Sequence, residues 1–410
     1  MTQQDALEVL KKGDNVFLTG EPGAGKTYTV NQYIAWMREH GKRYAVTAST
    51  GIAATHVNGV TIHSWSGIGI KREIKDRDIQ NLIFNDFAQR RICSAQVLII
   101  DEVSMLDSVM IDNIDAVTRG VRETDEPFGG LQVVFVGDFF QLPPVSKGEA
   151  LDFAFDSEAW KNANLTICYL TEQHRQSEGE FLEILTAMRQ GKVTKAHKQR
   201  LRECAYAPEG VPATQLYTHN ASVDRINEEE LAKIEGEPHE FVMSCDGNPF
   251  MVQMLKRRLL SPERLLLKVG AVVMFTRNNF EEGYVNGTIG TVLRFTQDGF
   301  PVIETKDGAE IAPRRAEWVI EEEGTVKASV RQIPLRLAWA ITVHKSQGMS
   351  LDAASVNLAN AFEYGQGYVA ISRVRSLAGL HLRGINERAF EMHPRVVEQD
   401  AEFRKMSDAI

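Results

Sequence analysis

Residues 20–27, GEPGAGKT, bring glycines, a lysine and a threonine together in a fixed spacing. The spacing matches the phosphate-binding pattern G-x-x-x-x-G-K-[ST], with an apolar run before it and an amphipathic helical pattern after it. Glycines let the backbone wrap a phosphate with its N–H groups inward, and the helix start adds partial positive charge. The residues expected to contact a nucleotide are Gly20, Glu21, Pro22, Gly23, Ala24, Gly25, Lys26 and Thr27.

An acidic pair ends the hydrophobic run of LIIDEVSM, residues 98–105. Two carboxylates at the end of a buried strand are costly unless they face a metal ion or water. Beside a phosphate loop, Thr27 and Asp101 are expected to hold Mg²⁺, and Glu102 to orient and deprotonate an attacking water. The combination favours nucleotide hydrolysis over binding alone.

A further polar group stands in VGDFFQLPPV, residues 136–145, where Gln141 could sense the γ-phosphate or its water. The alternative is a polar turn before the two prolines.

Charge on the transferring phosphoryl group also calls for an arginine, which can accelerate such reactions on the order of a thousandfold or more. Arg175 and Arg373 are the candidates, and structural salt bridges are the alternative for either one.

Two segments have the composition of a surface that binds a single nucleic-acid strand. Residues 47–69 are rich in Thr, Ser, Gly and His and contain Trp65, and residues 338–352 offer similar groups. Hydroxyls, imidazoles and an indole suit phosphate oxygens and stacked bases. A lone histidine is more often structural, but two such segments beside nucleotide elements favour strand contacts.

The elements that must position these residues follow an α/β pattern. Short β-branched runs at 15–20, 44–50, 97–102 and 131–138 alternate with helical patterns, as in a doubly wound parallel sheet. The periodicity weakens around 66–90, which predicts a small surface excursion. Residues 1–165 are therefore expected to form the first domain.

A second α/β set is predicted for residues 166–239 plus 334–410. Its expected strands are 165–175, 214–220, 353–359 and 378–384, with helices at 220–234 and 365–376. Residues 240–333 change to Val, Ile and Thr runs separated by glycine turns. Asp298-Gly299 and Asp307-Gly308 are hairpin candidates there, so the segment reads as an inserted antiparallel β unit.

Composition sets outer bounds on function. The 410 residues suffice for two or three domains, and 43% hydrophobic with 25% charged residues is typical of a globular protein. The net charge of −9 argues weakly against nucleic-acid binding, although local basic clusters occur. The four cysteines form no C-x-x-C pair. Neither a signal peptide nor a bilayer-spanning run is apparent, so a cytoplasmic protein is expected.

The order of these motifs resembles the Pif (petite integration frequency) group of superfamily-1 DNA helicases, close to RecD and Dda. The resemblance runs nearly end to end. It rests on GEPGAGKT, TASTGIAATHVNGVTIHSWSGIG, IIDEVSM, GDFFQLPPV, LTEQHRQ, AWAITVHKSQGMS and GQGYVAISRVRS, and most specifically on MIDNIDAVTRGVRETDEPFGG, residues 110–130. It implies two RecA-like domains that hold ATP and Mg²⁺ and move 5′→3′ on single-stranded DNA.

The resemblance also assigns roles by position. It makes Gln141 the γ-phosphate sensor, Arg175 and Arg373 the arginine fingers, and Gln3 or Gln4 the glutamine that reads adenine. Gln347 and Gly348 are further nucleotide-binding candidates. The candidate DNA-binding residues are Thr50, Gly51, His63, Ser64, Trp65, Phe140, Asn220, Thr342, His344, Lys345 and Ser346.

At the level of domains, the resemblance makes residues 66–90 a strand-separating wedge and residues 240–333 a small inserted β-barrel. It implies unwinding of duplexes, forks, R-loops and G-quadruplexes by a protein that functions as a monomer. The compact chain looks bacterial or phage-like. Two other readings remain: an ATP-gated DNA-binding or loading module that hydrolyses slowly, and a helicase directed to RNA, since backbone contacts discriminate sugars poorly.

Overall fold

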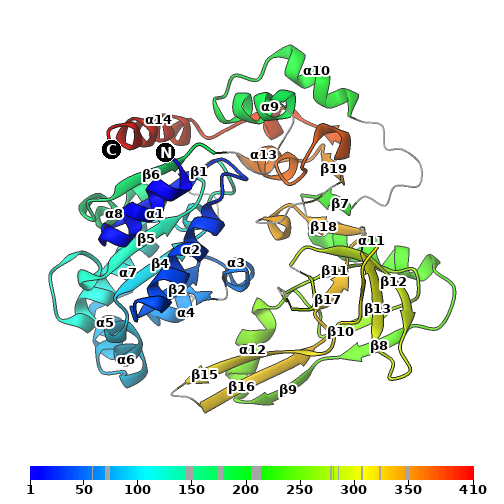
Figure 1. Cartoon of the computed structure of the whole chain (residues 1–410), viewed down its shortest axis with the longest axis horizontal. Helices are drawn as coiled ribbons and strands as arrows, with labels where there is room; N and C mark the ends of the chain where they lie inside the picture. The colour runs from blue at the N-terminus through cyan, green and yellow to red at the C-terminus, as the bar shows by residue number, and fades with distance from the viewer. Residues whose placement is uncertain are drawn as a thin grey trace. The chain divides into compact units, whose positions relative to one another are not determined.

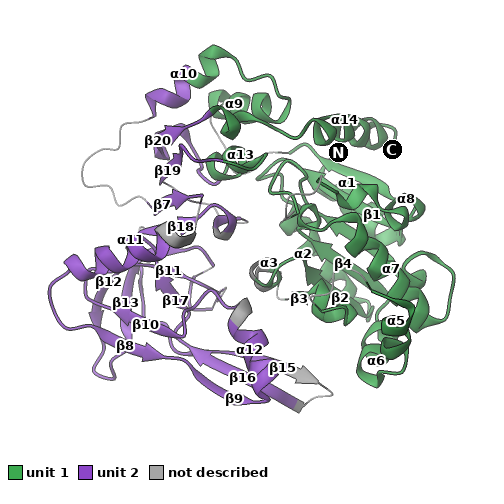
Figure 2. Ribbon diagram, turned by 180° about the vertical axis from the view of Figure 1, so that it is seen from behind, with its two compact units in different colours: residues 1–198, 362–372, 387–410 green, residues 199–361, 373–386 purple. Residues whose placement is uncertain are grey.

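The computed structural model describes the chain except residues 58, 70–73, 145–150, 173–178, 205–213, 219, 278, 280, 285, 306–307, 323–324, 348–350 and 352 (Figure 1). The chain divides into two compact units (Figure 2). The first contains Met1–Lys198, Phe362–Ser372 and Glu387–Ile410, and the second contains Gln199–Ala361 and Arg373–Asn386. Each unit combines segments that are far apart in the sequence, so neither unit is one continuous stretch of chain.

A six-stranded parallel sheet forms the centre of the first unit, in the order β3-β2-β4-β5-β1-β6. Its strands are β1 (Val16–Gly20), β2 (Tyr44–Ala48), β3 (Val60–Thr61), β4 (Val97–Asp101), β5 (Gln132–Val136) and β6 (Thr166–Leu170). Parallel strands need crossover connections, which the intervening helices supply. The expected parallel α/β fold is confirmed.

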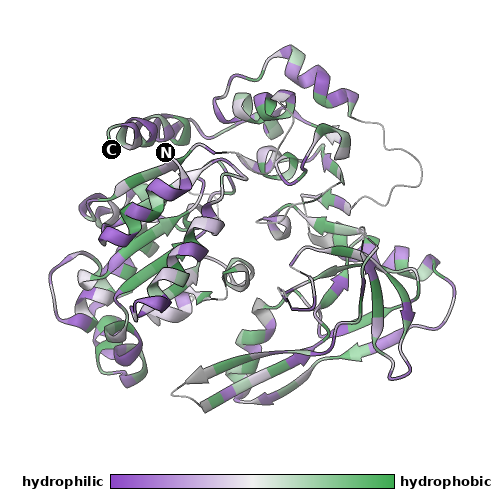
Figure 3. Ribbon diagram, viewed as in Figure 1, coloured by the Kyte–Doolittle hydropathy of each residue, from purple (hydrophilic) through white to green (hydrophobic). Residues whose placement is uncertain are grey.

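Successive side chains of β1 point to opposite faces of this sheet, and both faces are covered. Val16 and Leu18 belong to a buried cluster with residues of α1 (Gln3–Lys12) and α2 (Lys26–Glu39). Phe17, on the opposite face, lies 5.0 Å from the rings of both Trp160 and Phe403. A strand buried on both sides reads as a continuous apolar run, which is the pattern of VFLTG and the hydropathy visible in Figure 3.

The position of β6 corrects one expectation. The sequence pattern assigns residues 165–175 to the second α/β set, but β6 pairs in parallel with β1 from Val16↔Thr166 to Gly20↔Leu170. Hydrophobic periodicity identifies a strand but not the sheet to which it belongs, because the strand would bury the same side chains at the edge of either parallel sheet. The boundary expected near residue 165 therefore cuts through the first unit's sheet. The remaining boundaries of the three-domain division stay a prediction.

Further helices complete the first unit. They are α3 (Gly51–His56), α4 (Ile62–Ser66), α5 (Asp76–Ile83), α6 (Asp86–Ser94), α7 (Ser108–Arg122), α8 (Glu158–Asn162), α9 (Gly179–Arg189), α13 (Gln366–Ile371) and α14 (Pro394–Asp408), while α10 (Lys195–Glu203) crosses between units. The 66–90 excursion contains α5 and the start of α6, with the 81% exposed Phe84 between them. No helix among the described residues is long and apolar enough to cross a membrane.

The 110–130 stretch folds into α7 and a tight turn, Pro127–Gly130. Asp115 accepts a 2.6 Å hydrogen bond from the Phe128 backbone N–H, and Arg122 Nε donates to the Gly129 carbonyl at 2.5 Å. Gly129 adopts a φ of +66°, and a Cβ there would lie 2.6 Å from the Thr118 carbonyl oxygen. Acid, arginine and glycine together fix the turn that leads into β5.

The second unit contains a four-stranded parallel sheet, β18-β7-β19-β20. Its strands are β7 (Thr214–Tyr217), β18 (Ala340–Thr342), β19 (Ala354–Leu358) and β20 (Leu380–Ile385). Asn227, on α11 (Asn220–Lys233), holds the edge strand because its side chain donates to the Ala340 carbonyl and accepts from the Ala340 N–H. The three expected strands at 214–220, 353–359 and 378–384 all lie in this sheet.

Residues 240–333 form antiparallel structure, as expected. A five-stranded sheet runs β14-β13-β12-β11-β17, a second runs β15-β16-β9, and β8 pairs with β10. The elements are β8 (His239–Val242), β9 (Ser244–Gly247), α12 (Pro249–Arg258), β10 (Arg264–Leu267), β11 (Val272–Phe275), β12 (Ile289–Phe295), β13 (Pro301–Thr305), β14 (Glu310–Ile311), β15 (Ala316–Glu322), β16 (Thr325–Gln332) and β17 (Leu335–Leu337). Gly299, with φ +81°, turns between β12 and β13.

We expect Gly129→Ala to lower the thermal unfolding midpoint of the first unit by about 2–8 °C more than a matched glycine variant. The added Cβ would meet the Thr118 carbonyl in a backbone conformation that already disfavours L-residues. Gly41→Ala is the control, because Gly41 has a similar φ of +62° and nothing within 4 Å of an added Cβ. Equal midpoints for the two variants would contradict this account of the turn.

Candidate nucleotide site and strand-contact segments

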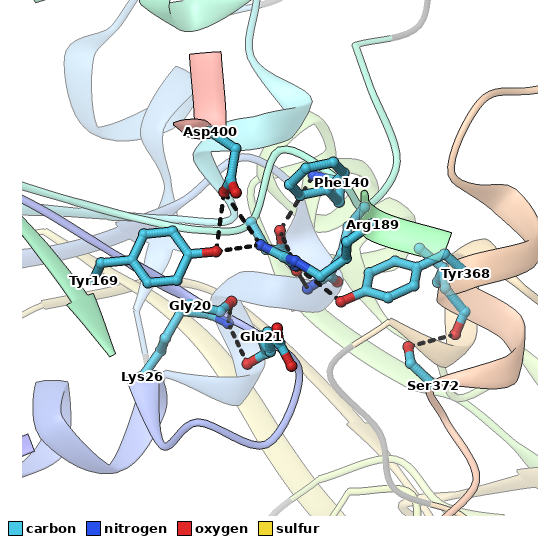
Figure 4. A network of polar contacts seen from close by, with 12 residues as sticks. Gly20, Glu21, Lys26, Phe140, Tyr169, Arg189, Tyr368, Ser372 and Asp400 are labelled. Carbon is cyan, nitrogen blue, oxygen red and sulfur yellow. Dashed lines mark hydrogen bonds and ion pairs between the residues drawn. The ribbon is translucent and has the colours of Figure 1, made fainter. Parts of the chain in front are cut away.

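The phosphate loop connects the end of β1 to the start of α2. The Lys26 ammonium donates to the Gly20 carbonyl at 2.8 Å and to the Glu21 carbonyl at 3.2 Å (Figure 4). Gly25 precedes α2 in a left-handed conformation with φ +89°. The lysine is thus positioned by the loop's own backbone, at the helix N-terminus where a phosphate is stabilised.

Gln3 lies against this loop, and Gln4 does not. Gln3 Nε2 donates to the Ala24 carbonyl at 3.1 Å, and a Cβ on Gly25 would lie 2.0 Å from that nitrogen. Gln4 Nε2 donates instead to the exposed Glu8. Of the two glutamines that the sequence leaves open for adenine, Gln3 is the one near the loop.

Asp101 and Glu102 follow the end of β4. Asp101 accepts a 2.8 Å hydrogen bond from the Glu102 N–H. The pKa of Asp101 is raised to about 6, because the effect of burial exceeds the opposing effects of that hydrogen bond and of the Lys26 charge. Glu102 has φ +52° and ψ +44°, a left-handed backbone conformation that residues other than glycine rarely adopt. Strained backbone conformations of this kind cluster at functional sites.

Gln141 lies in the loop after β5 and is 6% exposed. Its Nε2 faces Asp138 Oδ2 at 3.4 Å, and its Oε1 is buried without a hydrogen-bond partner among the described residues. A buried acceptor with no partner costs free energy, so it calls for a ligand or water there. This geometry fits a phosphate-sensing role better than a plain polar turn.

These groups converge because β4, β5 and β1 are neighbours in one parallel sheet. Their carboxyl ends meet at one edge, where open α/β sheets bind ligands. Among the described residues no cluster of three or more metal-ligating side chains occurs. Mg²⁺ beside a nucleotide usually takes one or two protein ligands plus phosphates and water. Thr27 and Asp101 would hold it.

Of the two candidate arginines, Arg373 lies in the described part of the chain. Arg175 lies outside the described residues. Arg373 is 2% exposed, belongs to the second unit, and follows α13 by two residues. Its carbonyl accepts from the Leu351 N–H at 2.8 Å. Gln347 is 7% exposed, and Gly348 is outside the described part of the chain.

The first-unit strand-contact candidates differ in their exposure. Thr50 accepts from the Ala53 N–H at the start of α3, next to Gly51. His63 and Ser64 on α4 are half-buried. Trp65 is 3% exposed, and its strand contact stays a prediction. Its carbonyl accepts from Arg91 Nε at 2.6 Å.

Three further candidates are also buried. Phe140 is 3% exposed and its ring lies 4.2 Å from the Arg189 guanidinium. Thr342 is 2% exposed, and Ser346 is fully buried with its hydroxyl donating to the Val343 carbonyl at 2.7 Å. Strand contacts by these three residues stay predictions.

The remaining candidates stay predictions. His344 is half-buried within the short helix His344–Ser346. Asn220 begins α11 and Lys345 lies in that short helix, but both side chains are outside the described part of the structure. What sequence reasoning missed is Arg189, which lies in none of the motifs above and contacts both Asp138 and Tyr368.

Comparison with known proteins matches this architecture. Residues 3–199 match the family of PIF1-like helicases. The ATP-dependent DNA helicase Pif1 of Psychrobacter sp. is 43% identical over 99% of this chain and 71% of its own length. The chain spans 61%, 63% and 63% of the PIF1 helicases of zebrafish, frog and human, which is less than two thirds of each.

Solved structures agree over nearly the whole chain. Pif1 from Bacteroides sp. in complex with ADP-AlF4 has a TM-score of 0.85 at 32% identity, covering 98% of this chain and 96% of that one. Bacteroides Pif1 with ADP-AlF3 and single-stranded DNA has a TM-score of 0.71 at 31% identity, covering 98% and 96%. The expected RecA-like fold, and ATP with Mg²⁺ as the family's cofactors, are thereby confirmed. The chain belongs to the PIF1-like helicase family.

Proposed function

We propose that this chain is an ATP-dependent DNA helicase that moves 5′→3′ along single-stranded DNA and unwinds the duplex ahead of it. The proposal rests mainly on the convergence of Lys26, Asp101 and Gln141 at the ends of three neighbouring parallel strands. That set could bind, hydrolyse and sense a triphosphate, which favours a motor over a loading module that hydrolyses slowly. The Pif1 complex with a nucleotide analogue and single-stranded DNA supports the choice of substrates.

In the proposed mechanism Mg²⁺·ATP supplies the phosphoryl group and an electrophilic counter-charge. The Lys26 ammonium exchanges the Gly20 and Glu21 carbonyls for phosphate oxygens. Glu102 takes the proton of the attacking water, and the free Oε1 of Gln141 orients that water or reads the γ-phosphate. Arg373 and Arg175 complete the charge compensation when nucleotide is bound.

Movement requires that both units hold the same strand. We assign this grip to Thr50, Gly51, His63 and Ser64 in the first unit, and to His344, Lys345 and Asn220 in the second. Closure around ATP at the cleft between the RecA-like domains and opening after hydrolysis would advance the strand between the two grips.

The α5–α6 segment is the proposed wedge that separates the two strands of a duplex. Forks, R-loops and G-quadruplexes are the proposed substrates, and a monomer, cytoplasmic in its cell, is the proposed working form.

We expect Lys26→Ala to reduce kcat for ATP hydrolysis by at least about a hundredfold, because the positive charge that the phosphate loop places at the phosphates is lost. Steady-state phosphate release measures this. Lys12→Ala, at an exposed lysine in the last turn of α1, is the matched control and should retain wild-type turnover. Wild-type kcat in Lys26→Ala would remove the phosphate loop from the mechanism.

Arg373→Ala should keep nucleotide affinity within a few-fold while kcat falls on the order of a thousandfold, because the arginine acts on charge that develops in the transition state. Fluorescent-nucleotide binding and turnover are measured on one preparation, whose unfolding midpoint confirms that it folds. Arg375→Ala, at the exposed arginine two residues on, is the control. Normal hydrolysis by a folded Arg373→Ala protein would sink the finger assignment.

Polarity and substrate class are tested by unwinding paired substrates that differ only in overhang. We expect a DNA duplex with a 5′ single-stranded overhang to be separated with ATP, and its 3′ counterpart to stay paired. An RNA overhang of the same sequence distinguishes the tracking strand. Unwinding from the 3′ overhang would reverse the polarity, and binding without unwinding on either DNA substrate would favour a loading module.

A further inference from the structure

Arg189, the last residue of α9, carries a charge that the helicase motifs do not explain. Its side chain is 1% exposed, and burial alone disfavours a charged guanidinium. Its partners come from four separate places in the sequence and all lie in the first unit (Figure 4). They are Asp138, Phe140, Tyr169, Tyr368 and Asp400.

The first connection is to the sensor loop. Arg189 Nη1 lies 2.8 Å from both carboxylate oxygens of the fully buried Asp138. The same carboxylate accepts from the Phe140 N–H at 3.2 Å and faces Gln141 Nε2 at 3.4 Å. Two short contacts to the guanidinium orient the Asp138 carboxylate, so the arginine fixes the group that faces Gln141.

The second connection is to α13. Arg189 Nη1 contacts the Tyr368 hydroxyl at 2.9 Å, and Tyr368 is fully buried. Gly365, the residue before α13, packs so closely on the sensor loop that an added Cβ would lie 2.4 Å from the Phe140 carbonyl oxygen. The helix and the loop are thus joined by a polar contact and by a close backbone approach. Arg373 follows the end of this helix in the chain.

The third connection extends to the phosphate loop. Arg189 Nη2 contacts the Tyr169 hydroxyl at 2.8 Å, and that hydroxyl is 3.0 Å from Asp400 Oδ1 on α14. Asp400 Oδ2 accepts from Arg404 Nε at 2.8 Å, and Arg404 lies 3.8 Å from Glu21. Arg189 therefore stands between the phosphate loop, the sensor loop and α13.

Two buried polar atoms show that this cluster is not optimised for stability alone. Arg189 Nε and Gln141 Oε1 have no hydrogen-bond partner within the described part of the chain. A polar network kept only for folding would be expected to satisfy its members. The free Gln141 oxygen belongs to the residue that the network holds in place.

We propose that Arg189 is a positioning residue that joins Gln141 and α13 into one body, so that the state of the γ-phosphate at Gln141 sets the position of the helix that leads to Arg373. The inference rests on the proposed ATPase function. Tyr368 is its link to α13, and Asp138 is its link to Gln141. Arg189 itself touches neither nucleotide nor DNA in this account.

Tyr368→Phe tests the link, because it removes one hydroxyl and keeps the buried ring. We expect kcat at saturating single-stranded DNA to fall about tenfold, the loss typical of one hydrogen bond to a charged group, with KM for ATP and the unfolding midpoint unchanged. Tyr33→Phe is the matched control. It removes another fully buried tyrosine's hydroxyl, bonded to Gln132 at 2.9 Å on the other side of the same sheet, and should leave kcat unchanged.

A double-mutant cycle with Gln141→Ala separates positioning from mere packing. If Tyr368 acts through Gln141, Tyr368→Phe should cost no further kcat in the Gln141→Ala background. Arg189→Lys, which keeps the charge but loses the forked donors, should show the same non-additivity with Gln141→Ala.

Independent, multiplicative losses in the cycle, or a kcat unchanged in Tyr368→Phe, would overturn the inference. Wild-type protein in the same assay distinguishes its failure from that of the proposed function. Wild-type turnover that DNA does not stimulate contradicts the proposed function itself, whereas normal stimulation with additive variants contradicts only the role of Arg189.

Discussion

The parallel register of β4, β5 and β1 is the constraint on which the candidate site depends. β1 pairs with β5 from Val16↔Val134 to Leu18↔Val136, and β5 pairs with β4 from Val97↔Gln132 to Ile100↔Phe135. Three strands in this register must end at the same edge. The phosphate loop, the acidic pair and the sensor loop, which together span more than a hundred residues of sequence, therefore meet at that edge.

Around that edge the structure keeps features that lower stability. Glu102 holds a left-handed backbone, Gln141 keeps a buried oxygen unpaired, and burial raises the pKa of Asp101. Each of these costs free energy in the protein alone, and each is relieved or used when a charged ligand arrives. The surrounding sheet, buried on both faces, supplies the stability that tolerates them.

Local patterns were sufficient for the phosphate loop, the acidic pair and most strands, because their glycine spacing, charge and periodicity are local in sequence. They failed where position depends on distant partners. Residues 165–175 read as a strand, but only the fold shows β6 beside β1. Trp65 and Phe140 have the residue types of a base-stacking surface, and only the fold shows that both are buried. Arg189 and Tyr368 lie 51 and 230 positions from Asp138, so no local pattern could join the three residues and only the fold does.

The account combines a hydrolysis site in one unit with strand contacts in two, and its central claim is that the two are coupled. The direct measurement is steady-state ATP hydrolysis by the wild-type chain with no DNA, with single-stranded DNA and with blunt duplex. Coupling predicts strong acceleration by the single strand and little by the blunt duplex. Equal rates in all three conditions would contradict it, because hydrolysis would then proceed without reference to the strand that it is meant to move.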